Sequence, residues 1–338
     1  MMVDLTTTYL GLTLKNPLVP SSSPLTGHFD DARRLEDAGA AALILPSLFE
    51  EELIHEQESL DRFVVMQDIG HHEADSFLPN AHHFESRLDQ TLEQIRRYKA
   101  ALSIPVVASL NGITDSGWVD HAKDLEEAGC DAIELNLYGM NAEPGARSEI
   151  IEQRYLHIVQ RLVEAVQVPC TVKLSNQFTG LMHFVTALEV NGAAGVSLFN
   201  RFYQPDIDLE SLQVKPQLSL SSCQETLLRI RWLALLRPQV TFTLAATGGF
   251  HGFQDALKAL LAGADVVHLC SVLLKGGPEV IQDVLRGMSQ WMEDREYQSV
   301  QQLKGSLSHQ NAVNPVGYER ENYMDVLDSY QRSPGVRV

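Results

Sequence analysis

The chain is poor in cysteine, poor in basic residues and free of long apolar runs. Its few cysteines form no Cys-x-x-Cys pair and three of them fall on or beside expected strands, which argues against a zinc or iron–sulfur site and fits reduced core residues in the cytoplasm. No apolar run approaches the length of a membrane span, and no basic segment followed by an apolar one opens the sequence. We expect a cytoplasmic protein without membrane contact. The cysteines are Cys130, Cys170, Cys223 and Cys270.

The shortage of basic residues excludes another class of partner. The 338 residues include 44 Asp and Glu against 26 Lys and Arg, which gives a formal net charge of -18. Such a surface repels nucleic-acid phosphates and anionic membranes. With 44% hydrophobic residues, the chain can form one large core. We therefore expect a single barrel domain that binds a small-molecule substrate and no nucleic acid.

Four stretches of the chain end a helical pattern with glycine and continue as a short apolar run. A glycine just past the last helical residue is a left-handed helix stop, and a run of Ala, Val, Ile and Leu is typical of a strand buried on both faces. Helix, glycine and buried strand form half of a βαβ unit, so the sequence predicts repeated parallel α/β units. The four glycines are Gly39, Gly129, Gly192 and Gly263.

The number of units predicts the architecture. No glycine-rich dinucleotide fingerprint follows the first strand, so eight alternating strands and helices favour a closed (β/α)8 TIM barrel over an open sheet. The strands are expected at 17–20, 41–45, 105–110, 131–136, 169–174, 194–199, 241–246 and 265–270. The helices are expected near 28–38, 84–102, 116–128, 147–166, 179–191, 224–236, 251–262 and 278–293.

Two segments exceed what a barrel requires. The long acidic connection over 47–84 follows strand two and is expected to lie over the barrel opening as a lid. It carries His71, His72, His82 and His83, but adjacent histidines point in different directions, so we expect no metal. Residues 305–338 form a helical tail beyond the barrel of residues 1–304, and this tail is expected to pack on the barrel or on a neighbouring subunit of a homodimer.

Polar residues gather where the expected strands end, and in this fold function lies at that face. Strand four is followed by Asn136, Tyr138 and Asn141, strand five ends at Lys173, and strand six at Asn200. Several such side chains buried together suggest a ligand that supplies their partners. A turn cap is an equally good explanation for any single asparagine.

The last two units predict a phosphate site. Gly248 and Gly249 follow strand seven and precede a helix, and Ser271 stands in the corresponding place after strand eight. Glycines let a phosphate approach backbone N–H groups, and the helix start favours its negative charge. Barrels commonly bind phosphate after strands seven and eight.

The predicted chemistry depends most on one polar residue, Lys173. At a strand end it can act as a Schiff-base nucleophile, as a phosphate clamp or as a cation beside an electron-rich cofactor ring. A core ion pair with Glu134 on the adjacent strand is the structural alternative.

From Gly11 to Gly305 these motifs resemble the dihydroorotate dehydrogenases, in particular the soluble FMN-containing class and a divergent dihydroorotate dehydrogenase-like branch. The resemblance implies a short N-terminal hairpin before strand one, FMN, a role in pyrimidine biosynthesis and a flavin-dependent reaction at a CH–CH bond. It implies that Asn136 and Lys173 contact the flavin ring and that Asn141 and Asn200 contact a planar substrate. It further implies a flavin lining by Ser22 and Ser23 and a phosphate site at Gly248, Gly249 and Ser271.

The departures from the family pattern affect the substrate half of the site. The family lysine of strand two falls at Pro46, the catalytic Cys or Ser at Gly139, a substrate-binding Asn at Ala74, and a serine after Asn200 at Arg201. Dihydroorotate itself is therefore not the expected substrate, which would be a pyrimidine or a related planar acid.

Other residues would have to replace the catalytic and substrate-binding side chains that these departures remove. Tyr138 is the first candidate for the missing base, followed by Ser175 and a lid histidine, and Arg201 is a candidate partner for a substrate carboxylate. Two alternatives remain open. One is a non-redox barrel enzyme that uses Lys173 as a Schiff base, and the other is a catalytically impaired flavin-binding protein.

Overall fold

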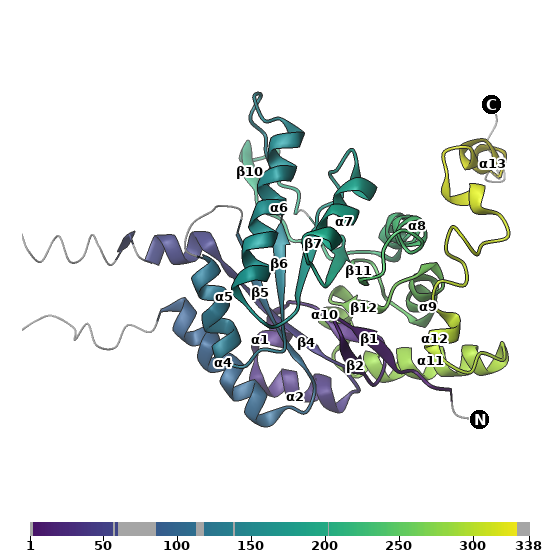
Figure 1. Cartoon of the computed structure of the whole chain (residues 1–338), viewed down its shortest axis with the longest axis horizontal. Coiled ribbons are helices and arrows are strands. Elements are labelled where there is room, and N and C mark those ends of the chain that lie inside the picture. Colours follow the sequence, from purple (N-terminus) through teal and green to yellow (C-terminus); the bar gives the residue numbers. More distant parts are fainter. Residues whose placement is uncertain are drawn as a thin grey trace, which may run out of the picture.

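The computed structural model describes residues 3–56, 58–59, 86–112, 118–137, 139–201 and 203–329. Eight parallel strands form one sheet in the order β3-β12-β11-β8-β7-β6-β5-β4 (Figure 1). The ends of this sheet meet, since the N–H of Ala41, just before β4, donates to the carbonyl of Leu18 in β3 at 3.0 Å. The strands are β3 (Leu18–Pro20), β4 (Leu43–Phe49), β5 (Val106–Asn111), β6 (Ala132–Leu137), β7 (Cys170–Leu174), β8 (Gly195–Leu198), β11 (Thr243–Thr247) and β12 (Val266–Leu269).

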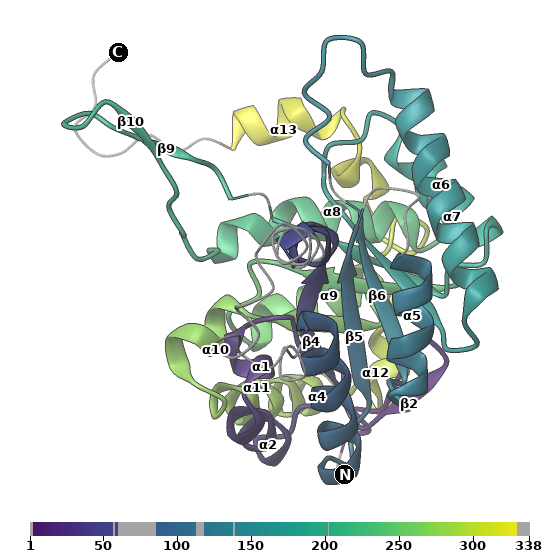
Figure 2. The same ribbon diagram turned by 90° about the vertical axis from the view of Figure 1, so that its left-hand side faces the viewer.

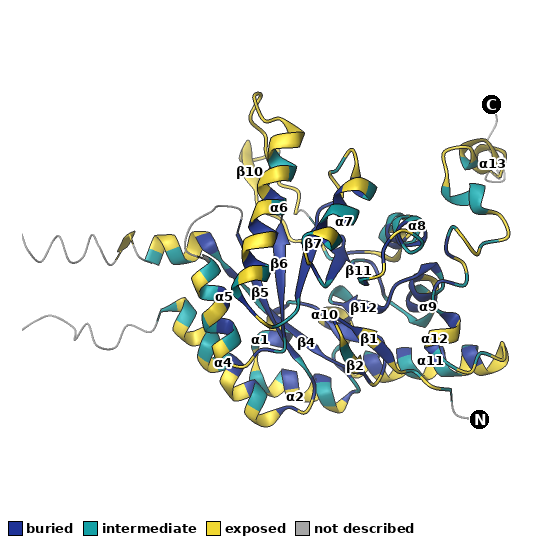
Figure 3. Ribbon diagram, viewed as in Figure 1, coloured by how far each residue is buried: buried dark blue, intermediate teal, exposed yellow. Residues whose placement is uncertain are grey.

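Eight helices cover the outside of this sheet, so the predicted (β/α)8 barrel is confirmed. In Figure 3 the barrel strands are buried, whereas the outward faces of the helices are exposed. Each predicted strand and helix matches an observed one with ends shifted by at most four residues. The helices are α2 (Phe29–Asp37), α4 (Arg87–Ala101), α5 (Trp118–Glu127), α6 (Ser148–Ala165), α7 (Leu181–Val190), α8 (Thr226–Leu236), α9 (Phe253–Ala262) and α11 (Val280–Asp294).

The four predicted glycine stops have the expected backbone. Gly39 has φ of 106° and Gly263 has φ of 127°, values that other residues rarely adopt. The N–H of Gly39 donates to Glu36 and that of Ala40 to Leu35, which satisfies the last carbonyls of α2 before the chain enters β4. Gly129 and Gly192 also have positive φ.

β4 is longer than the predicted strand. It continues to Phe49 because Ser47, Leu48 and Phe49 still pair with β5 after an irregularity between Ile44 and Ser47. Pro46 lies within that irregularity, and proline cannot donate a ladder hydrogen bond. Residues 50–56 are helical, and most of the predicted lid, including His71, His72, His82 and His83, lies outside the described residues.

The N-terminal hairpin closes the end of the barrel opposite to the strand carboxyl ends. It consists of β1 (Thr7–Tyr9) and β2 (Leu12–Leu14). Tyr9, Leu10 and Leu14 are buried and pack with Val19 and Val266 from the barrel strands. The predicted hairpin is thus part of the core.

A second hairpin, which is absent from the elements expected from the sequence, separates β8 from α8. It consists of β9 (Asp206–Asp208) and β10 (Gln213–Lys215) and projects away from the body in Figure 2. Short helices α1 (Pro24–Gly27) and α10 (Ser271–Gly276) follow β3 and β12. A 3-10 turn, η2 (Cys223–Glu225), precedes α8, and its Cys223 is exposed rather than in the core.

The tail begins against the barrel of its own chain. The N–H groups of Gly305 and Leu307 donate to carbonyls of α9, and that of His309 donates to Ala234 of α8. The division at residue 304 remains a prediction. α12 (Val300–Leu303) precedes the tail, whose elements in the described residues are η3 (Pro315–Tyr318) and α13 (Asn322–Asp328). No helix in the described part of the chain combines the length and apolar character of a membrane-crossing segment.

Candidate active site

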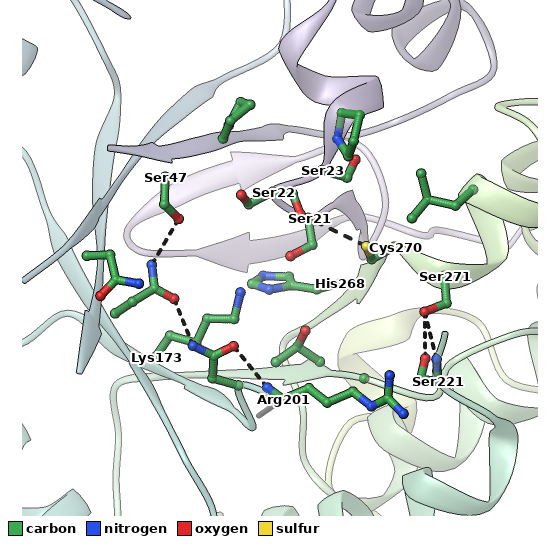
Figure 4. A pocket seen from close by; sticks show the side chains of 18 of the residues that line it. Ser21, Ser22, Ser23, Ser47, Lys173, Arg201, Ser221, His268, Cys270 and Ser271 are labelled. Carbon is green, nitrogen blue, oxygen red and sulfur yellow. Dashed lines mark hydrogen bonds between the residues drawn. The ribbon is translucent and has the colours of Figure 1, made fainter. Parts of the chain in front are cut away.

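A cavity of about 750 Å³ opens at the carboxyl ends of the barrel strands. Residues from β3, β4, β6, β7, β8, β11 and β12 or the turns that follow them line it, as expected for this fold (Figure 4). Eight of the residues singled out in the sequence meet here: Ser22, Ser23, Asn136, Lys173, Asn200, Gly248, Gly249 and Ser271.

The floor of the cavity carries a buried ion pair. Lys173 Nζ lies 3.3 Å from Glu134 Oε1, and the two side chains are 10% and 0% exposed. The ion pair considered as the structural alternative is therefore present, while Lys173 still lines the cavity. Ser197 donates its hydroxyl to Glu134 Oε2 at 2.9 Å. His268 lies beside Lys173 in Figure 4, with Nδ1 4.0 Å from Glu134 Oε2.

Burial and charge set the protonation of this group. Burial opposes ionisation of Glu134, but Lys173 and the hydrogen bond from Ser197 hold the pKa of this carboxyl below its ordinary value. Burial lowers the pKa of His268 to about 4, so the imidazole is neutral at pH 7. Lys173 is thus the cation that balances Glu134 under neutral conditions.

Asn136 is held in a fixed orientation above the ion pair. Its Nδ2 donates to Ser109 Oγ at 3.0 Å and to the Leu110 carbonyl at 3.1 Å. Its Oδ1 accepts a 3.4 Å hydrogen bond from Asn200 Nδ2, so the asparagines of β6 and of the turn after β8 are joined. The register of β6 and β7 sets Asn136 directly opposite Lys173.

Ser221 organises the predicted phosphate corner. Its hydroxyl lies 2.8 Å from that of Ser271 and accepts from the Gly249 N–H at 3.3 Å. His251 Nε2 lies 2.8 Å from the Ser221 carbonyl, and Lys275 Nζ donates to the same carbonyl at 3.4 Å. Two hydroxyls, glycine N–H groups and a nearby ammonium are donors that fit a phosphate group.

Both glycines at this corner are required by the backbone. Gly248 and Gly249 have φ of 91° and 93°, and a Cβ on Gly248 would lie 2.8 Å from Arg229 Nη2. Arg229 is buried and donates through Nε to the Thr247 carbonyl at 3.0 Å, which fixes the end of β11. The corner is therefore closely built rather than an accidental turn.

The departures from the family pattern have structural counterparts. Pro46 lines the cavity and packs on Gly27. A Cβ added to Gly27 would lie 2.9 Å from Pro46 Cγ. Arg201 also lines it, but its Nε is paired with Glu225 at 3.2 Å and its Nη1 donates to the Ser219 carbonyl. The guanidinium is thus held at the wall by partners within the protein.

Asn141 and Gly139 lie outside the lining of the cavity. The Asn141 side chain donates to the Gly139 carbonyl at 3.0 Å and to the Tyr155 hydroxyl at 3.1 Å. The Gly139 N–H also donates to Tyr155, and a Cβ at this position would lie 3.0 Å from that hydroxyl. The structure does not bring Asn141 together with Asn200, because Asn141 belongs to this cluster around Tyr155.

Within the described part of the chain, none of the candidate bases lines the cavity. Tyr138 and the lid histidines His71, His72, His82 and His83 lie outside these residues, and the fifth lid histidine, His55, does not line the cavity. Ser175 is buried, does not line the cavity and accepts from the Gln177 N–H at 3.3 Å. Within the described ranges, no group of three or more His, Cys, Asp or Glu residues is arranged to hold a metal ion.

Sequence reasoning missed three residues of this site. Ser221 comes from the loop before η2 and carries no strand-end signal. Ser197 and His268 lie within strands, where alternation places them inside the barrel with Glu134. Their polar character on otherwise apolar buried strands was the available signal.

Known proteins support the chemistry suggested by this geometry. The family model for dihydroorotate dehydrogenase matches residues 78–292. The catalytic subunit of dihydroorotate dehydrogenase B (NAD(+)) from Thermoplasma acidophilum is 25% identical over 322 residues, with 90% of this chain and 99% of that protein covered. The NAD-dependent dihydropyrimidine dehydrogenase subunit PreA of Escherichia coli K12 is 24% identical over 331 residues, covering 92% and 78%. A putative dihydroorotate dehydrogenase A (fumarate) from Aeropyrum pernix is 25% identical over 320 residues, covering 89% and 97%. The chain belongs to the dihydroorotate dehydrogenase family of flavin-dependent oxidoreductases.

Proposed function

We propose that the protein uses FMN to oxidise or reduce a CH–CH bond in a pyrimidine or a related planar acid. The observation that carries this proposal is the arrangement of one cavity, with the cation of Lys173 and the Asn136–Asn200 pair on its floor and the Ser221–Ser271 hydroxyls at its corner. The corner suits the phosphate of FMN and the floor suits an electron-rich ring. Bound FMN would supply hydride transfer.

The residues of the floor would orient the ring and hold charge beside it. Lys173 would stabilise negative charge that develops on the ring, and such a fixed cation lowers a barrier because it needs no reorganisation. Asn136 is held by Ser109 and Leu110, so its amide is already oriented before a ligand binds. Asn200 would contact the substrate on the open side.

The substrate half departs from the family pattern that the sequence resembles. Pro46 offers no cation, and Gly139 offers no side chain, since a Cβ there would already lie 3.0 Å from the Tyr155 hydroxyl. We infer that Arg201 contacts a substrate carboxylate, which would compete with Glu225 for the guanidinium. Tyr138 remains our proposal for the base, and a substrate contact by Asn141 would require its side chain to leave the Tyr155 hydroxyl and turn toward the cavity. A homodimer and a cytoplasmic location also remain proposals.

The two alternatives differ in their support. Membership of a flavin-dependent family argues against the non-redox barrel enzyme, as does the ion pair of Lys173 with Glu134, because a Schiff-base lysine must react as a free amine. The catalytically impaired flavin protein differs from our proposal only in turnover. Anaerobic bleaching of the flavin by a panel of dihydropyrimidines and related acids separates the two.

The visible spectrum of the purified protein tests the proposal. We expect a yellow protein with non-covalent FMN close to one per chain, identified by mass spectrometry after denaturation. Apoprotein prepared by mild denaturation and refolding should take up FMN. A colourless protein that neither retains nor takes up FMN would overturn the proposal, and release of FAD or riboflavin would correct the cofactor.

A further inference from the structure

Glu134 is a carboxylate placed in the interior of the barrel, directly below the cavity floor. It lies in β6 two residues before Asn136, on the same inward face, and it is 0% exposed. Both carboxylate oxygens are used, because Oε1 accepts from Lys173 and Oε2 from Ser197. The three residues of this cluster come from adjacent strands: Glu134 from β6, Lys173 from β7 and Ser197 from β8.

A buried carboxylate is costly, so its presence requires an explanation. Removing one charge from water costs several kcal/mol, and a buried pair repays this only when geometry and additional hydrogen bonds are good. An apolar residue would fill the same place in a barrel core without that cost. Lys173 could likewise be replaced by an apolar residue unless its charge is needed at the cavity.

The other titratable groups that face Glu134 are neutral at pH 7. Burial lowers the pKa of His268 to about 4, and burial raises the pKa of Tyr9 well above its ordinary value. Tyr9 stacks edge-on against His268, with ring centroids 5.8 Å apart. Lys173 and Glu134 therefore form an ion pair with no net charge, and the titratable groups around it in the described part of the chain are neutral.

We propose that Glu134 is a positioning residue that holds Lys173 protonated and directed at the cavity floor. The inference deepens the proposed function, on which its meaning for catalysis rests. Without Glu134, an ammonium that is only 10% exposed would lose its counter-ion and its hydrogen-bond acceptor. Burial then favours the neutral amine. The floor would lose the cation that a reduced ring requires.

Chemical labelling of the full-length, flavin-free protein tests this directly. Cyanate carbamylates neutral amines and not ammonium groups, so the rate at Lys173, followed by peptide mass spectrometry, reports the neutral fraction. We expect the rate at neutral pH to be at least about tenfold higher in Glu134→Gln than in wild type, because each tenfold increase in neutral amine raises the rate tenfold. Glu134→Asp, which retains the charge, should lie between them.

Internal controls separate protonation from general exposure. Lys99 pairs with Asp131 at 2.7 Å on the outside of the barrel and should react equally in all variants. Circular dichroism checks that each variant is folded. If Glu134→Gln does not fold, Ser197→Ala, which removes one hydrogen bond and leaves the ion pair, should give a smaller rise at Lys173 only. Equal rates at Lys173 in wild type and in the folded variants would overturn the inference.

The flavin-loaded protein gives a second and independent readout. We expect Glu134→Gln to retain FMN and to show a pH-dependent change in the flavin absorption spectrum that wild type and Lys173→Met lack. The double variant Glu134→Gln/Lys173→Met should lack it too. Absence of the change in Glu134→Gln would contradict the inference while leaving the proposed function intact. Failure of wild type to bind FMN would overturn the proposed function, and the labelling result would still decide the role of Glu134.

Discussion

The hydroxyl groups of Ser221 and Ser271 lie 2.8 Å apart although 50 residues separate them in the chain. Ser221 precedes η2 and α8, whereas Ser271 is the first residue of α10 after the last barrel strand. The loop before α8 thus reaches the corner where the last two barrel units end. The Gly249 N–H completes the group by donating to Ser221.

This corner predicts a specific loss of FMN affinity. Ser221→Ala and Ser271→Ala should each weaken FMN binding about tenfold or more, because a hydrogen bond to a charged group contributes about 1.5–3 kcal/mol. Fluorescence titration of apoprotein measures the change. Ser211→Ala in the exposed β9–β10 turn is the matched control. Unchanged FMN affinity in both corner variants would show that the phosphate binds elsewhere.

Substitution of Gly249 is a poorer test of the same site. Its φ is 93°, and a Cβ there would lie 2.8 Å from the Ser222 carbonyl. An aspartate at this position would strain the turn as well as repel the phosphate, so loss of flavin would have two explanations.

Lys173→Ala should slow flavin reduction about 10² to 10³-fold and weaken FMN binding much less, because the cation matters most when charge develops on the ring. Stopped-flow reduction and FMN titration measure the two effects. If both change by the same factor, Lys173 acts only in binding. Trapping of a substrate carbonyl on Lys173 by borohydride would instead support the Schiff-base alternative.

Loss of Lys173 should also destabilise the fold. Lys173→Met leaves Glu134 buried without its cation and should lower the free energy of unfolding by about 3–5 kcal/mol. Adding Glu134→Gln should restore much of this loss, because the pair is then replaced by neutral side chains. Urea unfolding of the two single variants and the double variant measures the coupling, and strictly additive losses would contradict it.

His268 predicts a pH dependence of stability. Its pKa is lowered from 6.5 to about 4 in the folded protein, so between these values the unfolded chain binds a proton that the folded chain does not. Stability should therefore fall as the pH drops through this window, by about 3 kcal/mol in total. Urea unfolding at several pH values measures the slope. His268→Gln should remove this contribution, and an unchanged slope in that variant would assign the effect to other groups.

Wild-type protein should oxidise dihydroorotate poorly or not at all. A positioned base contributes about 10² to 10⁴ to removal of the proton, and Gly139 offers no side chain at the family position. The defect should appear in anaerobic bleaching of the flavin, while reoxidation of chemically reduced FMN proceeds normally. Tyr138→Phe tests the substitute base once a substrate is known. Rapid bleaching by dihydroorotate at a rate unchanged in Tyr138→Phe would contradict both inferences.

The barrel could be predicted because its signals are local and repeated. Gly39, Gly129, Gly192 and Gly263 each mark a helix end by a backbone conformation that depends on the residue itself. Buried parallel strands are apolar on both faces, so they stand out from amphipathic helices. The β9–β10 hairpin was missed because its strands are three residues long and mostly exposed, and such segments carry no clear periodicity.

The candidate site was only partly predictable for a different reason. Strand-end residues such as Lys173 and Asn200 are brought together by the fold class alone. Ser221 reaches the corner through a loop whose path is set by packing, and Asn141 leaves the cavity because Tyr155, on α6, supplies a hydrogen-bond partner. Such partners depend on tertiary contacts that sequence spacing does not reveal.

Within the described residues, the β1–β2 hairpin closes one end of the barrel and the cavity opens at the other. Tyr9 is buried at one end, and Glu134, Ser197 and His268 are buried below the cavity that Lys173 lines at the other end of the described barrel. A ring bound on the floor would cover these groups and would restrict their access to the bulk solvent. Proton exchange at the buried pair should then be slow in the loaded protein, so that its charge stays constant over many turnovers even when the surrounding pH fluctuates.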